Sequence, residues 1–108
     1  MTNASAPSTD ALWSELWASL ASLLRSYTAA HGLNTNREAI VELTEERIVV
    51  HHGKNRLILH RDRAQITWTR ENGDTGFLQL TEHGRLLSSD GEEALDMAAE
   101  AWARELMQ

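Results

Sequence analysis

The sequence contains no cysteine and a single proline among its 108 residues. Without cysteine the chain can form no disulfide, no thiolate metal site, no cysteine-ligated iron–sulfur cluster and no thiol nucleophile. It also has no apolar run long enough to cross a bilayer, because the longest, Leu12 to Leu24, is interrupted by serine and glutamate. No basic segment precedes an apolar stretch near the N-terminus, as a secretion signal requires. We therefore expect a cytoplasmic protein that binds no membrane.

Basic charge is also scarce, since 10 Lys and Arg residues stand against 16 Asp and Glu residues and give a net charge of −6. This balance argues against nucleic acid as a partner. Apolar residues make up 42% of the chain, which is enough for one packed core. The length fits one domain. We expect a flexible segment over residues 1–9 and a single domain over residues 10–108.

Helical periodicity is present near both ends of the chain. Thr9 or Asp10 can cap a first helix, and Gly32 can end it. Its apolar stripe consists of Leu12, Leu16, Leu20, Leu23 and Tyr27, widened by Trp13, Trp17 and Leu24. Residues 89–93 have the spacing of a reciprocal cap and predict the start of a second helix there. The stripe of that helix consists of Leu95, Ala98, Ala99, Trp102 and Leu106.

Between the helices the pattern changes to short strand-like runs separated by turn residues. The predicted strands are Glu38–Leu43, Arg47–His52, Arg56–His60, Gln65–Arg70 and Thr75–Thr81, with a possible short sixth at Arg85–Ser88. Connections this short imply antiparallel neighbours. The sequence therefore predicts an α+β fold, a two-layer sandwich in which an antiparallel meander sheet of five to six strands carries both helices on one face.

Two hairpins allow the register to be considered. A two-residue turn at Gly53-Lys54 predicts one face with Ile48, Val50, Leu57 and Leu59, and an opposite face with Arg47, Val49, His51, Arg56, Ile58 and His60. At Asn72-Gly73 two registers remain open. A two-residue turn places Trp68 beside Phe77, whereas a three-residue loop with a bulge groups Ile66 and Trp68 with Leu78 and Leu80.

The face opposite the core mixes apolar and charged side chains, which suits a protein interface. The candidate partner-binding residues are Val49, His51, Arg56, Ile58, His60, Trp13 and Trp17. The two tryptophans lie one helical turn apart and can either complete the core or present an aromatic anchor. The core role is favoured, because large apolar residues in small domains are usually needed for burial.

No arrangement typical of catalysis or metal binding is visible. The five histidines, His31, His51, His52, His60 and His83, lack the spacing of convergent zinc ligands. No serine lies in a strand-to-helix elbow, and the glycines form no phosphate-binding loop. We expect a protein that is not an enzyme, with no metal and no cofactor.

Charge is unevenly distributed along the chain. Residues 37–70 hold seven basic and five acidic residues, whereas residues 71–108 hold nine acidic residues and two arginines. The basic middle hairpin has three interpretations. The favoured one is an exposed edge kept soluble by its charge. The second is a docking surface for an acidic partner or for the acidic C-terminal helix of a second copy, and the third is a contact with nucleic acid.

The helix–meander–helix order is similar to that of the frataxin family over nearly the whole chain. The stretches Leu57–Arg61 and Gln65–Trp68 resemble that family's central strands. The resemblance implies metal handling in iron–sulfur assembly, with carboxylates around residues 38–46, although the first helix offers only Asp10 and Glu15 where the family has an acidic ridge.

Our leading hypothesis is a non-catalytic protein-binding or assembly module that associates with another protein or with a second copy of itself. A frataxin-like metal-handling protein is the alternative.

Overall fold

The first helix is longer than the sequence predicts. The computed structural model describes residues 5–33 and 38–108, with α1 at Ser5–His31. The predicted cap at Thr9 or Asp10 is therefore wrong as a helix start. Pro7 lies in the first turn, where its missing N–H has no helical partner to lose, so the helix extends through it. The predicted end is confirmed, since α1 ends at His31 and Gly32 follows it. The Gly32 N–H donates to the Thr28 carbonyl at 2.9 Å.

The sheet has seven strands rather than five or six. All neighbours are antiparallel and follow sequence order, so the meander is confirmed. The strands are β1 (Ile40–Leu43), β2 (Arg47–His52), β3 (Asn55–Asp62), β4 (Gln65–Arg70), β5 (Thr75–Leu80), β6 (Arg85–Ser88) and β7 (Gly91–Ala94), followed by α2 (Leu95–Leu106). The short strand predicted at residues 85–88 is confirmed as β6.

Strand β7 occupies the segment where the sequence predicts a helix start. Gly91 pairs with Ser88, and its φ of +127° suits the tight connection between β6 and β7. Glu92 and Glu93 pair with Leu87 and Leu86, so they belong to the ladder rather than to a helix cap. Helix α2 begins only at Leu95, after the end of β7, and has no side-chain hydrogen bond at its N-cap.

The hydrophobic core lies between the helices and one face of the sheet. The predicted register of β2 and β3 is confirmed residue by residue, from Arg47 opposite His60 to His51 opposite Arg56. The fully buried face of this hairpin consists of Ile48, Val50, Leu57 and Leu59. They pack in one cluster with buried residues of both helices, among them Trp17, Leu20, Leu24, Leu95, Ala98, Ala99, Trp102 and Leu106. This confirms the two-layer α+β arrangement.

The β4–β5 hairpin has the three-residue loop. The Arg70 N–H donates to the Asp74 carbonyl at 2.8 Å, and the Gly73 N–H, at φ +93°, donates to the Arg70 carbonyl at 3.0 Å. Ile66 therefore lies opposite Leu78, and Trp68 lies opposite Gly76. This register places Phe77 on the face away from the core.

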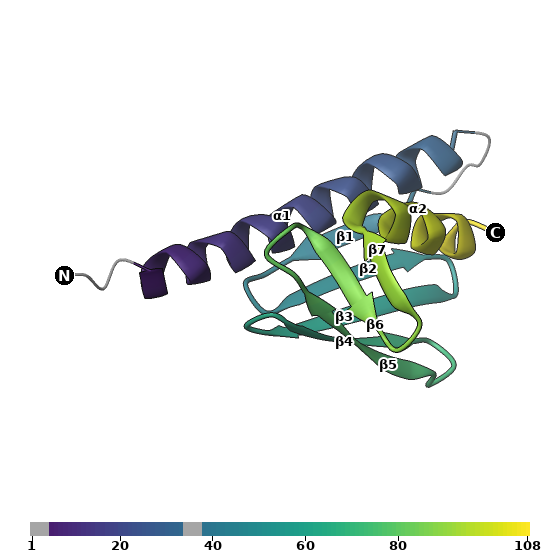
Figure 1. Ribbon diagram of the computed structural model, residues 1–108. Coiled ribbons are helices and arrows are strands. Elements are labelled where there is room, and N and C mark those ends of the chain that lie inside the picture. The colour runs from purple at the N-terminus through teal and green to yellow at the C-terminus, as the bar shows by residue number, and fades with distance from the viewer. Residues whose placement is uncertain (1–4, 34–37) are drawn as a thin grey trace.

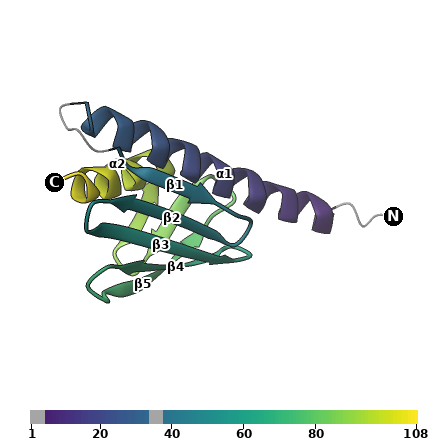
Figure 2. The same cartoon turned by 180° about the vertical axis from the view of Figure 1, so that it is seen from behind.

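The sheet is strongly curved. Figure 1 shows β6 and β7 turned steeply across the line of β3 to β5, with α1 and α2 side by side above them. Seen from behind, β1 to β5 form a ladder that no helix crosses (Figure 2). The helices thus fill the concave side and leave the convex side open. In the part of the chain that the structure describes, no helix has both the length and the apolar character needed to span a membrane.

Candidate functional site: the convex face of the sheet

Five of the seven predicted binding residues lie together on the convex face. Val49 is directly opposite Ile58 at its centre, with the pairs Arg47–His60 and His51–Arg56 on either side. Val49 and Ile58 are half-buried among their charged neighbours, and Arg56 is exposed. The sequence pattern was sufficient to group these residues, because a two-residue turn leaves only one register.

Further apolar side chains extend this face beyond the predicted set. Ile40 on β1 is 58% exposed, Phe77 on β5 78%, and Leu87 on β6 41%. Sequence reasoning missed Phe77 because the register of its hairpin was open. The available signal was the alternation along β5, which sends Phe77 away from the core whenever Leu78 and Leu80 face it.

The two tryptophans of α1 do not belong to the convex face. Trp17 is only 2% exposed, and its Nε1 donates a hydrogen bond to the Thr44 carbonyl at 2.9 Å. The Arg61 guanidinium lies 5.6 Å from the centre of the Trp17 ring. Trp13 is half-buried against the core cluster. Trp17 therefore has the core role that the sequence favoured and offers no accessible anchor.

The cations of the basic hairpin differ in their surroundings. Arg61 donates two hydrogen bonds to the Glu45 carbonyl, at 2.8 and 3.1 Å, which fixes its side chain at the end of the sheet. The backbone N–H of Arg56 donates to the Glu71 carboxylate at 3.0 Å, and this bond lowers the pKa of Glu71. The guanidinium groups of Arg47 and Arg56 lie exposed at the surface and are available to a partner.

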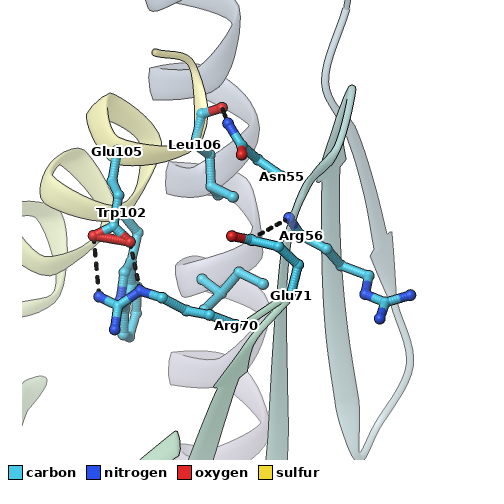
Figure 3. A pocket seen from close by; sticks show the side chains of 8 residues that line it. Asn55, Arg56, Arg70, Glu71, Trp102, Glu105 and Leu106 are labelled. Carbon is cyan, nitrogen blue, oxygen red and sulfur yellow. Dashed lines mark hydrogen bonds and ion pairs between the residues drawn. The ribbon is translucent and has the colours of Figure 1, made fainter. Parts of the chain in front are cut away.

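A small cavity beneath α2 marks an anchor for the helix rather than a ligand site (Figure 3). Its volume of about 40 Å³ suits water-sized occupants only. Arg70 donates to both oxygens of Glu105, at 2.6 and 3.0 Å, and these bonds raise the pKa of Arg70. The Leu106 carbonyl accepts from Asn55 Nδ2 at 2.7 Å and from His52 Nδ1 at 3.1 Å. The C-terminal end of α2 is thereby fixed to the sheet.

The histidines do not converge. Among residues 5–33 and 38–108, no group of three or more His, Asp or Glu side chains has the geometry to hold a metal ion. His31 Nε2 lies 2.9 Å from Glu100 Oε2 in a hydrogen bond that joins the two helices. Hydrogen bonds from Arg104 and His31 lower the pKa of Glu100. His51 lies 3.5 Å from the Glu42 carboxylate on the convex face.

No family model, curated protein or solved structure matches the chain. Its function must therefore be inferred from its own surfaces.

Proposed function

We propose that this protein is a non-catalytic assembly module that associates with a second copy of itself through the convex face of its sheet. The observation that carries this proposal is the Val49–Ile58 pair, an apolar centre that neither helix covers, surrounded by charges of both signs. An apolar centre with a polar rim is the usual composition of a protein interface. Ile40 and Phe77 enlarge the apolar part.

The arrangement of charges favours a second copy as the partner. Arg56 and Asp62 lie on the same face of β3, each three residues from Leu59. Consider two copies packed convex face to convex face, with a two-fold axis that lies between the sheets and runs across the strands at the level of Leu59. This axis places Arg56 of one copy against Asp62 of the other. The same axis exchanges the level of Glu42, Val49 and Ile58 with that of Arg47 and His60, so the apolar pairs of the two copies lie on either side of the axis, one residue from it. A surface that is complementary to itself in this way is what a two-fold contact requires.

The frataxin-like alternative has no comparable support. It requires converging carboxylates around residues 38–46. In that segment, Glu42 lies 3.5 Å from His51, and Glu45 and Glu46 lie in the turn between β1 and β2. No observation here favours metal handling over assembly.

The first test uses light scattering over a range of concentrations. Ile58→Glu places a charge at the centre of the contact and is expected to weaken dimerisation by about a hundredfold or more, in the range of central interface residues. Met97→Glu is the matched control, because Met97 is an exposed apolar residue on α2, on the other side of the molecule. Circular dichroism checks that both variants fold. A wild-type protein that stays monomeric at high concentration would overturn the proposal.

The second test exchanges the charges. Arg56→Glu and Asp62→Arg each place like charges against one another across the two-fold axis, so each alone should weaken the dimer. The double variant restores opposite charges and should recover most of the lost affinity. A double variant as weak as the sum of its two parents would contradict the proposed axis.

A further inference from the structure

The ladder between β5 and β6 ends early. β4 and β5 pair over five positions, from Gln65–Gln79 to Thr69–Thr75. β5 and β6 pair at only two, Gln79–Leu87 and Leu80–Leu86. In the described part of the chain, the first four residues of β5 therefore have a strand on one side only. We call the opening between residues 75–78 of β5 and the β6–β7 hairpin the seam.

The backbone groups that face the seam can be identified from the hydrogen-bond pattern. The bonds from Arg70 N–H to Asp74 and from Leu80 N–H to Ala64 show that the even-numbered residues of β5 bond to β4. Groups along a strand alternate in direction, so the odd-numbered residues face β6, as the bond from Thr81 N–H to Arg85 confirms. The N–H and C=O groups of Thr75 and Phe77 are thus directed into the seam, where no strand of the described chain pairs with them.

The seam opens into a hollow on each side of the sheet. The concave hollow, of about 480 Å³, has a mixed lining whose apolar residues include Trp68, Leu86, Ala101 and Trp102. The convex hollow, of about 420 Å³, has a lining that includes Phe77, Gln79 and Leu87. Phe77, Leu78, Ser88 and Ser89 line both hollows. An added strand directs alternate side chains to opposite faces, so it would place them in the two hollows in turn.

The charge at the rim of the concave hollow is negative. Asp90 and Glu93, from the β6–β7 hairpin, line it, and the structure gives neither carboxylate an ion pair within the described residues. In the described part of the chain, Arg70 is the only cationic residue that lines the concave hollow, and its charge is neutralised by the Glu105 carboxylate, to which it donates two hydrogen bonds. A ligand with Lys or Arg beside an apolar side chain matches this rim, whereas an acidic one does not.

We propose that the seam binds an extended, basic peptide segment of a partner protein, which adds to the free edge of β5 as a further strand. The peptide backbone pairs with Thr75 and Phe77, an apolar side chain enters the hollow between β5 and α2, and a basic side chain lies beside Asp90 and Glu93. Main-chain pairing supplies affinity and the hollows supply selectivity. This site is separate from the Val49–Ile58 centre, and the proposal stands independently of self-association.

The experiment measures fluorescence polarisation with a labelled peptide of about nine residues, near the upper end of the usual range of strand lengths. The peptide has Lys at both ends and alternating Thr and Leu between them. Two matched peptides carry Glu at the ends or N-methyl groups at alternate central residues, which removes the N–H donors. The Lys peptide should bind about tenfold or more tighter than either, and the Phe77 amide should exchange its hydrogen more slowly in the complex.

Variants of the protein locate the peptide. Ala101→Trp fills the concave hollow from the exposed side of α2 and should abolish binding, whereas Met97→Trp on the same helix lies outside the lining and should not. The double variant Asp90→Asn, Glu93→Gln should bind the Lys peptide more weakly, and its affinity should depend less on the salt concentration. The proposal is overturned if the Lys peptide does not bind. It is also overturned if N-methylation or Ala101→Trp leaves binding unchanged, or if Ala101→Trp abolishes dimerisation and the seam therefore holds a second copy.

Discussion

The contact between Gly76 and Trp68 allows the sharpest prediction about stability. The two residues are opposite one another on β4 and β5, and a methyl group at Gly76 would lie 2.5 to 2.7 Å from three atoms of the indole. A shift of about 0.9 Å is needed to restore ordinary contact at 3.4 Å. Because Gly76 does not have positive φ, alanine can adopt its backbone conformation, so the indole alone opposes the substitution.

The two effects of Gly76→Ala have opposite signs. Overpacking against the indole costs about 1–3 kcal/mol, whereas the reduced freedom of the unfolded chain favours alanine by about 0.4–1 kcal/mol. We expect a net loss of about 0.5–2 kcal/mol in the wild-type background. In a Trp68→Leu background the first effect disappears, so the same substitution should be neutral or stabilising.

Urea unfolding followed by far-ultraviolet circular dichroism gives all four free energies of the cycle. The change of sign between the two backgrounds is the decisive result, because a general effect of alanine at this position would be equal in both. Equal destabilisation with and without the indole would refute the reasoning, as would a wild-type background that tolerates Gly76→Ala without loss.

Two further predictions concern ionised side chains. The Arg56 amide lowers the pKa of Glu71 below its ordinary value of 4.5 in the folded state, so this interaction stabilises the protein above that pH and is lost as the pH falls through the folded-state pKa. Glu71→Gln should therefore lower the urea midpoint near neutral pH, and its difference from wild type should vanish in acid. Glu105→Gln removes the ion pair with Arg70 and should cost about 0.5–1 kcal/mol in low salt. Its effect should shrink in high salt, and a salt-independent loss would show that packing rather than charge is responsible.

The β2–β3 hairpin shows how much of the fold is encoded locally. Gly53 has positive φ in a two-residue turn, and strict alternation on both strands leaves one register that buries Ile48, Val50, Leu57 and Leu59. Turn geometry and burial act over a few residues here, so both can be deduced from the sequence. The five predicted binding residues of the convex face follow from the same register.

Strand β7 shows where local signals fail. Acidic residues after Ser89 are equally suited to the start of a helix and to the exposed positions of an edge strand. The choice depends on β6, which offers Leu86 and Leu87 as ladder partners for Glu93 and Glu92, and on the Arg85–Glu92 ion pair at 3.4 Å. Pairing with another strand overrides a cap whose benefit is about 1 kcal/mol. The seam was not predictable for a related reason. It depends on where the pairing of β5 with β6 stops, and this is set by another strand rather than by the residues of β5.

The packing of α2 explains why the seam stays open. β7 continues directly into α2 at Leu95, so closing the seam requires the β6–β7 hairpin to move and the helix to follow it. Leu95, Ala98 and Trp102 of that helix are buried in the core, and its far end is held by the bonds of Glu105 and Leu106 to the sheet. The buried contacts of the helix therefore oppose completion of the ladder. The edge of β5 is thus already open in the free protein, and a peptide that pairs with it needs no rearrangement of the fold. Binding to such a preformed edge avoids the ordering cost on the protein side, which leaves the entropy of the peptide as the main term that opposes it.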